Sequence, residues 1–270
     1  MLNNKIIGII GGGAMAEALI RGMLTAKLVA AERIVVSDVS EERLSFLANT
    51  FGVRTSLDSK AVSNQADVLF LAVKPQVISG VLDEIASSTK KTTVVVSIAA
   101  GITIAVLEAK LPGVPVIRVM PNTPVAVGAG MSAVALGSYA TTAMGDLAAT
   151  VFASVGRVVI VNESAMDAVT GLSGSGPSFA YVLIDALSDA GVRVGLPRQM
   201  ALTLAAQTLL GAAKMVLETG EHPAKLRDMV TSPGGTSIAG VHVLEQRSVR
   251  AALIDAVVAA AERSREMGTK

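Results

Sequence analysis

The sequence predicts an α/β fold, with a doubly wound parallel sheet, followed by an all-helical domain. Up to residue 162, short runs rich in Val and Ile alternate with amphipathic helical segments, and this alternation is typical of βαβ units. The runs are almost continuously apolar, as expected for strands that helices cover on both faces. After Asn162 no β-rich run recurs, and Ala and Leu recur at helical spacing. We therefore predict an α/β domain over residues 1–162 and a helical domain over residues 163–270.

The expected strands are separated by stretches long enough for crossover helices. Residues 41–51 and 76–86 are two such amphipathic stretches. Two later strands flank a helical segment around Asp146 and are expected to extend the sheet. In chain order, the strands are predicted at Ile6–Ile10, Ile34–Ser37, Val68–Val73, Val94–Ile98, Val116–Met120, Met131–Leu136 and Arg157–Val161.

The helical domain is divided by Gly and Pro, because Gly often ends a helix and Pro often begins one. Breaks are expected at Gly191, at Gly195-Leu196-Pro197, at Gly220 and at Ser232-Pro233-Gly234-Gly235. The helices carry few charges, so their apolar faces exceed what a domain of about 110 residues can bury alone, and association is expected. The helices are predicted over residues 164–190, 198–219, 223–230, 236–245 and 249–267.

Composition excludes several classes of function. The chain has 270 residues, with 23 basic and 22 acidic side chains and a formal charge of +1, so no basic surface for nucleic acid is expected. It contains no Cys, which excludes disulfides and thiolate chemistry and is consistent with a cytoplasmic location. Two His residues cannot form a His-rich metal site, and we expect no metal. Hydrophobic residues make up 51%, but Pro and Gly interrupt the uncharged residues 119–145, so no membrane association is expected.

The first strand leads into a glycine turn of the form Gly11-x-Gly13-x-x-Ala16, and a helical stretch follows directly. Gly11 permits a tight turn, and Gly13 has no Cβ to obstruct a pyrophosphate. Ala16 allows the helix to pack closely on the strand, with its N-terminus directed at the phosphates. Glycine turns also serve packing alone, but the strand before and the helix after this one favour a dinucleotide site.

Three strand ends add candidate residues, because open α/β sheets bind ligands at the carboxyl ends of their strands. Lys74 follows the third strand, and it is either a ligand contact or a solvated side chain beside Pro75. Residues 97–101 are mostly small, which suits either a flat ring or close packing. Residues 118–124 place Asn122 between two prolines, where its amide either orients a ligand or belongs to a connector.

Two motifs stand out in the helical half. Residues 170–177 combine Gly and Ser with Pro177, which removes one helical hydrogen bond and predicts a kink or break. Residues 231–238 combine hydroxyls and backbone amides at the start of a helix, an arrangement that suits a carboxylate. Close helix packing and an ordinary capped turn are the respective alternatives.

Taken together and in order, these motifs resemble those of pyrroline-5-carboxylate reductases over essentially the whole chain. The resemblance implies a Rossmann domain, a helical dimerisation domain that interlocks with a partner, and a higher assembly of dimers, often decameric. It also implies reduction of 1-pyrroline-5-carboxylate to L-proline by a nicotinamide cofactor, the last step of proline biosynthesis. The motifs that carry it are Gly11-Gly12-Gly13-Ala14-Met15-Ala16, Leu71-Ala72-Val73-Lys74-Pro75, Met120-Pro121-Asn122-Thr123-Pro124, residues 167–177 and Thr231-Ser232-Pro233-Gly234-Gly235-Thr236-Ser237.

The resemblance also assigns roles to residues of this sequence. The last residue of the substrate loop is usually Thr in the family, whereas Ser237 here keeps the hydroxyl and lacks the methyl. By resemblance, Gly11, Gly12, Gly13, Ala14, Met15 and Ala16 hold the pyrophosphate; Ala72, Val73, Lys74, Pro75, Ala99, Ala100, Gly101 and Asn122 line the nicotinamide end; and Ser232, Gly234, Gly235, Thr236 and Ser237 hold the substrate.

Reduction of a ring C=N bond needs a hydride donor, groups that bind the substrate carboxylate and a hydrogen bond to the ring nitrogen. The imine can acquire its proton before the hydride arrives, so no strong general acid is required. The Ser237 hydroxyl is the candidate catalytic group that bonds the nitrogen as its charge is lost, and orientation of the reactants supplies much of the acceleration.

The choice of cofactor depends on the end of the second strand. An acidic residue there binds the adenosine ribose, whereas an Arg receives a 2′-phosphate. This chain has Asp38 followed by Val39, so we expect Ser37 and Asp38 to contact the cofactor. Ser37, Ser40 and Arg43 are close enough in sequence to compensate if the loop turns Asp38 outward. We therefore expect both NADPH and NADH to work, with NADPH the candidate natural cofactor and its advantage reduced. The alternative role of Asp38 is to cap the helix that begins near Glu41.

Other functions remain as alternatives. A β-hydroxyacid dehydrogenase shares the layout but uses a Lys in its helical domain, and no Lys lies between Lys110 and Lys214. A related imine reductase is a further alternative. A deazaflavin-dependent reductase would not explain the Ser-Pro-Gly-Gly loop, and a non-catalytic nucleotide-binding protein would keep only the α/β half.

Overall fold

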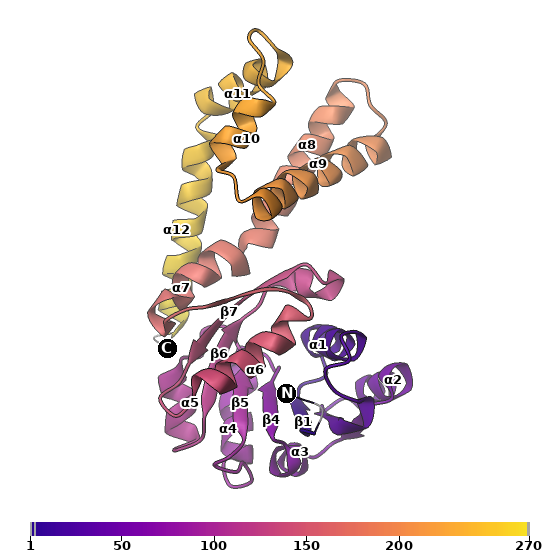
Figure 1. The fold of residues 1–270 in the computed structure, drawn as a ribbon, viewed down its shortest axis with the longest axis vertical. Helices are drawn as coiled ribbons and strands as arrows, with labels where there is room; N and C mark the ends of the chain where they lie inside the picture. The colour runs from indigo at the N-terminus through magenta and orange to yellow at the C-terminus, as the bar shows by residue number, and fades with distance from the viewer. Residues whose placement is uncertain (1, 3, 269–270) are drawn as a thin grey trace. The chain divides into compact units, whose positions relative to one another are not determined.

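The computed structural model describes residue 2 and residues 4–268, and its central feature is an eight-stranded sheet (Figure 1). The strand order is β3-β2-β1-β4-β5-β6-β7-β8, so the chain reverses direction across the sheet between β1 and β4. Such a reversal is the switch point of a doubly wound fold. The strands are β1 (Ile7–Ile10), β2 (Ile34–Ser37), β3 (Arg54–Ser56), β4 (Val68–Leu71), β5 (Val94–Ser97), β6 (Val116–Met120), β7 (Gly130–Leu136) and β8 (Gly156–Ile160).

All neighbouring strands run parallel except β6 and β7, which are antiparallel. A parallel connection needs a crossover of a dozen or more residues, and only a short 3-10 helix at Thr123–Val127 joins these two strands. The fold class predicted from the sequence is thus confirmed. The one antiparallel pair was not predicted. The edge strand β3 was also missed, because its sequence, Arg-Thr-Ser, has no apolar run.

Helices cover both faces of the sheet and explain why its strands are so apolar. On one face, α1 (Ala14–Thr25), α2 (Glu41–Phe51) and α6 (Thr142–Ala153) pack on a core that contains the edge-to-face pair Phe70 and Phe152. The other face carries a second core, formed with α3 (Ser59–Gln65), α4 (Ile78–Ile85), α5 (Ile104–Lys110) and α7 (Met166–Val169).

The described residues after β8 form helices, as the composition predicts. The predicted single helix over residues 164–190 is wrong, because a π-turn at Thr170–Gly174 separates α7 from α8. In that turn the Ser175 amide donates to the Thr170 carbonyl at 2.8 Å, and the kink or break expected at Pro177 takes the form of this interruption between α7 and α8. The helices that follow are α8 (Gly176–Arg193), α9 (Arg198–Thr219), α10 (Pro223–Met229), α11 (Thr236–Gln246) and α12 (Val249–Gly268).

The helix break predicted at Gly191 is also wrong. Helix α8 continues to Arg193, and a Cβ built on Gly191 would lie 2.7 Å from the Cβ of Ala201 on α9. This Gly therefore permits close approach of two helices. The chain does break at Gly195, at Gly220 and in the Ser-Pro-Gly-Gly loop, where no helix is assigned.

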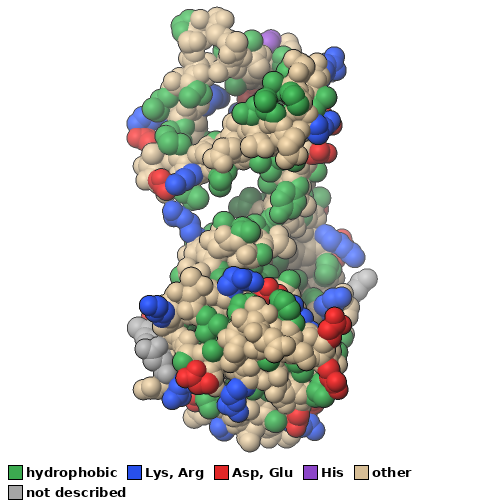
Figure 2. All heavy atoms as spheres, turned by 90° about the vertical axis from the view of Figure 1, so that its right-hand side faces the viewer, with side chains coloured by type: hydrophobic (Ala, Val, Ile, Leu, Met, Phe, Trp, Pro, Cys, Tyr) green, Lys and Arg blue, Asp and Glu red, His purple; other side chains and the backbone are tan. Residues whose placement is uncertain are grey.

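The chain forms two compact units. The first, the sheet unit, comprises the described residues up to Ser175 together with those from Ala259 onward; the second, the helical unit, is Gly176–Val258. The predicted domain division after residue 162 was based on composition and stays a prediction. Within the helical unit, all of which the structure describes, the buried side chains are Ser188, Ala201 and Ala205. Figure 2 accordingly shows many apolar side chains, in green, on the surface of this unit in the upper part of the view.

Helix α9 is the one described helix that is long and apolar enough to cross a membrane, judged by length and composition. Its apolar side chains include Leu202, Leu204 and Leu210, which are all exposed in a single copy of the chain. Helices that pack against other helices in soluble proteins pass the same test. The absence of a membrane partner stays a prediction from the sequence.

Candidate functional site

A pocket of about 450 Å³ lies at the carboxyl ends of β1, β2 and β4, at the switch point of the sheet. Ligands of open α/β sheets bind at this place. The backbone around it is held by two hydrogen bonds, from the Gly11 amide to the Ser37 carbonyl and from the Ala72 amide to the Ile10 carbonyl. The lining comprises Ile10, Gly11, Gly13, Ser37, Asp38, Val39, Leu57, Ser59, Ala72, Val73, Lys74, Val77, Val81 and Glu84.

The glycine turn has the conformation that its sequence predicts. Gly11 has a φ of +97°, and a Cβ there would lie 2.6 Å from the Ala72 carbonyl oxygen, so only Gly fits. A Cβ built on Gly13 meets no protein atom within 4 Å, which leaves open space at the start of α1. Ala16 is fully buried against the core. The residues present therefore fit a dinucleotide whose pyrophosphate lies over this turn.

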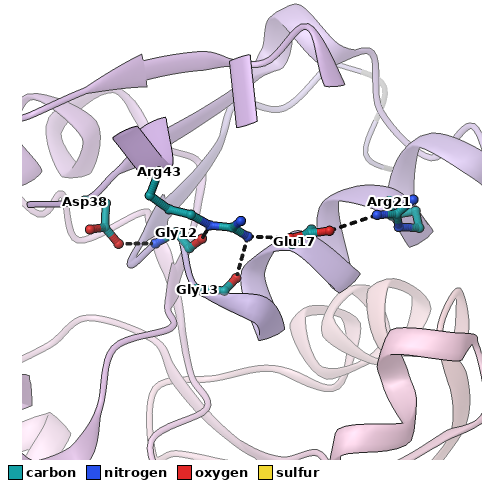
Figure 3. A network of polar contacts seen from close by, with 6 residues as sticks. All are labelled: Gly12, Gly13, Glu17, Arg21, Asp38 and Arg43. Carbon is teal, nitrogen blue, oxygen red and sulfur yellow. Dashed lines mark hydrogen bonds and ion pairs between the residues drawn. The ribbon is translucent and has the colours of Figure 1, made fainter. Parts of the chain in front are cut away.

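A polar network surrounds Gly12 (Figure 3). The Gly12 amide donates to Asp38 Oδ2 at 2.6 Å, and the Gly12 carbonyl accepts from Arg43 Nε. Arg43 Nη2 also lies 2.5 Å from Glu17 Oε2 and 3.5 Å from the Gly13 carbonyl. Glu17 Oε1 pairs with Arg21 at 2.8 Å. Two helices and the end of β2 are thereby tied to the glycine turn.

The network stabilises the ionised form of Glu17. The hydrogen bond from Arg43 lowers the pKa of the Glu17 carboxyl, and Arg21 lowers it further against the opposing effect of burial. Glu17 is thus ionised at neutral pH. The guanidinium of Arg43 also lies over the Phe46 ring, 4.8 Å from its centroid. Arg43 is therefore engaged by a carbonyl, a carboxylate and an aromatic face at once.

The structure separates two interpretations of Asp38. The cap of α2 is Ser40, whose hydroxyl accepts from the Arg43 amide at 3.2 Å. Asp38 instead accepts from the Ser40 and Gly12 amides and lines the pocket. It is turned inward, so the outward turn that would make room for a 2′-phosphate is not present. Its neighbour Ser37 is buried, and the Ser37 hydroxyl donates a hydrogen bond to the Ser59 hydroxyl at 3.3 Å.

The structure brings together only part of the predicted cofactor set. Among the pocket-lining residues are Gly11, Gly13, Ser37, Asp38, Ala72, Val73 and Lys74. The remaining predicted residues, Gly12, Ala14, Met15, Ala16, Pro75, Ala99, Ala100, Gly101 and Asn122, lie outside that lining, and their roles stay predictions.

Two of these outlying groups have contacts of their own. The Ala99 side chain is buried in the core, which agrees with the packing interpretation of residues 97–101. Asn122 joins two motifs, because its Nδ2 donates to the Ser173 carbonyl at 3.0 Å while its Oδ1 accepts from the Met131 amide at 2.8 Å. A Cβ on Gly174 would lie 2.6 Å from Met120 Cε. The loop after β6 and the π-turn thus pack together in the sheet unit.

The predicted substrate loop lies in the helical unit, at the start of α11. Gly234 has a φ of +68°, and Gly235 is the residue before the helix, with its amide donating to the Ser232 carbonyl at 3.0 Å. Thr236 and Ser237 are then the first two helical residues. Amides in the first turn of a helix lack intrahelical acceptors, so those of Thr236 and Ser237 suit an anion better than that of Gly235 does.

Sequence reasoning missed several pocket residues. Leu57 and Ser59 follow the unpredicted strand β3. Val77 ends the 3-10 helix that precedes α4, and Val81 and Glu84 lie within α4. Apolar residues placed directly after strand ends, such as Val39 and Leu57, are the sequence signal for part of this lining, and both side chains are exposed in the structure. Among the described residues, no group of three or more His, Asp or Glu side chains is arranged to hold a metal ion.

Strand order, switch-point pocket and glycine turn define the sheet unit as a Rossmann-like dinucleotide-binding fold. A family model described as pyrroline-5-carboxylate reductase dimerisation matches residues 163–267, and one described as NADP oxidoreductase coenzyme F420-dependent matches residues 6–101. The pyrroline-5-carboxylate reductase of Methanosarcina acetivorans is 48% identical over 270 residues, which cover 100% of both chains. The chain therefore belongs to the pyrroline-5-carboxylate reductase family.

Solved structures agree with this membership. The structure of a pyrroline-5-carboxylate reductase from Coxiella burnetii has a TM-score of 0.93 and 36% identity, covering 98% of this chain and 99% of that one. The pyrroline carboxylate reductase of Plasmodium falciparum, solved with NADP bound, has a TM-score of 0.88 and 29% identity, covering 99% and 100%. The α/β fold and its helical extension are thus those of the family.

Proposed function

We propose that this protein reduces 1-pyrroline-5-carboxylate to L-proline with NADPH or NADH, the last step of proline biosynthesis. The observation that carries the proposal is the switch-point pocket with its glycine turn, in a chain 48% identical over its full length to a relative named pyrroline-5-carboxylate reductase. The family model for the helical half supports the same assignment over residues 163–267.

The sheet unit is proposed to hold the cofactor. The amides at the start of α1 bind the pyrophosphate over Gly13, where the structure leaves open space, and Asp38 accepts hydrogen bonds from the ribose. Ala72, Val73 and Lys74 contact it at the end of β4. When bound, the nicotinamide supplies the hydride that reduces the C=N bond.

The helical unit is proposed to hold the substrate. The amides of Thr236 and Ser237 bind the carboxylate, and the Ser232 hydroxyl lies beside the same turn. The ring nitrogen is already protonated when the substrate binds, so none of these residues has to act as a strong general acid. Ser237 forms a hydrogen bond with that nitrogen as its positive charge disappears, which favours the transition state over the bound imine.

A spectrophotometric assay tests the proposal directly. The purified full chain, mixed with 1-pyrroline-5-carboxylate, is expected to oxidise NADPH and NADH, with proline as the product identified by chromatography. Omission of the imine is the control and should leave the cofactor unchanged. A folded sample that oxidises neither cofactor would contradict the proposal and favour a nucleotide-binding role without catalysis.

We also propose a homodimer formed through the helical unit, with a higher assembly of dimers, decameric in the form that the family resemblance implies. The dimerisation family model and the exposed apolar side chains of α9 support the dimer. A cytoplasmic location is proposed because the chain contains no Cys.

A further inference from the structure

Glu17 lies in the first turn of α1, at the helix end where the proposed function places a doubly charged pyrophosphate. We propose that Glu17 is a specificity-determining residue for the cofactor, because it holds Arg43 on the glycine turn and away from a 2′-phosphate. The inference rests on the proposed function only in naming the cofactor class. The role is one of positioning, since Glu17 acts through Arg43.

The two charged side chains proposed to discriminate the cofactors, Asp38 and Arg43, both contact Gly12. A Cβ built on Gly12 would lie 3.4 Å from both Asp38 Oδ2 and Arg43 Cγ. Asp38 binds the amide of Gly12, and Arg43 binds its carbonyl (Figure 3). A ribose with free hydroxyls can bond the Asp38 carboxylate, whereas a 2′-phosphate is repelled by it unless a cation intervenes.

Arg43 is the cation in this network that contacts the same glycine as Asp38, but it is already engaged. Its Nη2 lies 2.5 Å from Glu17, and the two side chains are only 27% and 23% exposed. In a partly shielded ion pair of this kind, the Glu17 carboxylate competes with any phosphate that approaches the Arg43 guanidinium. With Glu17 ionised, Arg43 stays on the turn and the carboxylate of Asp38 dominates the ribose end of the pocket.

Removal of the Glu17 charge is expected to release Arg43 toward the phosphate. Gln has nearly the same shape as Glu and can still accept a hydrogen bond from Arg21. Since the pair is worth about as much as other partly exposed ion pairs, its loss should favour the 2′-phosphorylated ligand by about fivefold. The ligand without this phosphate should respond much less, because Arg43 has no new partner there.

Binding of two probes tests this without any turnover: adenosine 2′,5′-bisphosphate and adenosine 5′-monophosphate, which differ by the 2′-phosphate alone. Calorimetric Kd values are measured for the full-length wild type and for Glu17→Gln, Glu42→Gln, Arg43→Met and Glu17→Gln/Arg43→Met. Glu42 is the matched control, because it is exposed on α2 and outside the network of Figure 3 but loses the same charge. In parallel, kcat/KM is measured with NADPH and NADH.

We expect Glu17→Gln to tighten binding of the bisphosphate about fivefold and that of the monophosphate less than twofold. Glu42→Gln should change the ratio of the two Kd values less than twofold, and Glu17→Gln should have no effect on it in the Arg43→Met background. The ratio of kcat/KM for NADPH over NADH should rise with the first variant.

Three outcomes would overturn the inference: an unchanged ratio in Glu17→Gln, an equal rise in Glu42→Gln, or a rise that persists without Arg43. Should Glu17→Gln lose its native circular dichroism spectrum, Arg43→Lys takes its place. Lys keeps the charge but cannot bond Gly12 and Glu17 together, so it should also favour the bisphosphate, and an unchanged ratio would contradict the inference. Wild-type protein that binds both probes but oxidises neither cofactor would contradict the proposed function and leave the binding test intact.

Discussion

The sheet unit and the helical unit differ in what they bury. The sheet unit encloses two apolar cores, one on each face, which include fully buried side chains such as Phe70, Phe152 and Leu82. In the helical unit, whose residues are all described, the buried side chains are one Ser and two Ala, while large residues such as Leu204 and Leu210 are exposed. The first unit therefore has the core of an independent domain, and the second does not.

This difference indicates how the work is divided. The proposed cofactor pocket is formed at strand ends and one helix start, and it needs only the rigid sheet of a single copy. The apolar faces of α8 and α9 need a cover, and the dimerisation family model over residues 163–267 indicates that a second copy supplies it. Stability of the proposed substrate loop is then linked to association, whereas stability of the proposed cofactor site is not.

The largest expected effect concerns the core of the sheet unit. Phe152→Ala removes a fully buried ring whose centroid lies 6.2 Å from that of Phe70, and it should lower the free energy of unfolding by about 3–5 kcal/mol. Denaturant unfolding at a fixed protein concentration measures this. The control Tyr139→Ala, at a side chain 55% exposed, should change the same quantity by less than about 0.5 kcal/mol. Equal effects of the two variants would contradict the assignment of a self-sufficient core.

A smaller effect tests the separation of substrate from cofactor. Ser237→Ala removes one hydroxyl at the start of α11 and should raise the barrier for imine reduction by about 1–3 kcal/mol. The Kd for NADPH should stay within twofold of wild type, because the proposed cofactor pocket lies in the other unit. Steady-state kinetics and fluorescence titration check the two parts, and Ser237→Thr, the usual family residue, should restore turnover. Unchanged kinetics in Ser237→Ala would leave this loop an ordinary capped turn.

The converse change affects only the sheet unit. Asp38→Asn keeps an acceptor for the Gly12 amide but removes the charge that repels a 2′-phosphate, so the ratio of kcat/KM for NADPH over NADH should rise about tenfold, or ~1.4 kcal/mol. The KM for the imine should not change. If the ratio does not rise in favour of NADPH, Asp38 does not discriminate between the two cofactors at the ribose.

The smallest effect concerns acid stability. Because the folded-state pKa of Glu17 lies below its ordinary value of 4.5, the unfolded chain takes up this proton first as the pH falls. The stabilisation from its ion pairs is therefore fully present at neutral pH and is lost as the pH drops through the folded-state pKa. We expect wild type to exceed Glu17→Gln in unfolding free energy by less than about 1 kcal/mol at pH 7, with the gap closing below about pH 4. A gap that does not change with pH would contradict an ionised Glu17.

Periodicity predicted most of the sheet, because buried parallel strands are apolar on both faces. Helices 41–51 and 198–219 were predicted with the bounds that the structure has. Strand β3 was missed because it is short, polar and stabilised by its neighbour β2, so its residues carry no pattern of their own. The antiparallel turn into β7 was missed because apolar runs do not record strand direction.

The candidate site was predictable where one segment forms it and less so where distant segments meet. The glycine turn is local, and its conformation follows from Gly11 and Gly13. The contacts of Arg43 join residues 26 and 31 positions apart, and nothing in the spacing of the sequence indicates that Glu17 would hold this side chain. Asn122 was recognised as an ordered polar residue, but its partner Ser173 lies 51 positions away.

The central claim is that one copy of the helical unit is incomplete, and the assembly state at low concentration tests it most directly. Light scattering and sedimentation are measured at low micromolar concentration and on further dilution, with imine reduction assayed in the same samples. We predict that every active sample has the mass of a dimer or a larger assembly, and that activity falls if dilution produces monomer. A monodisperse monomer with full activity would contradict the claim.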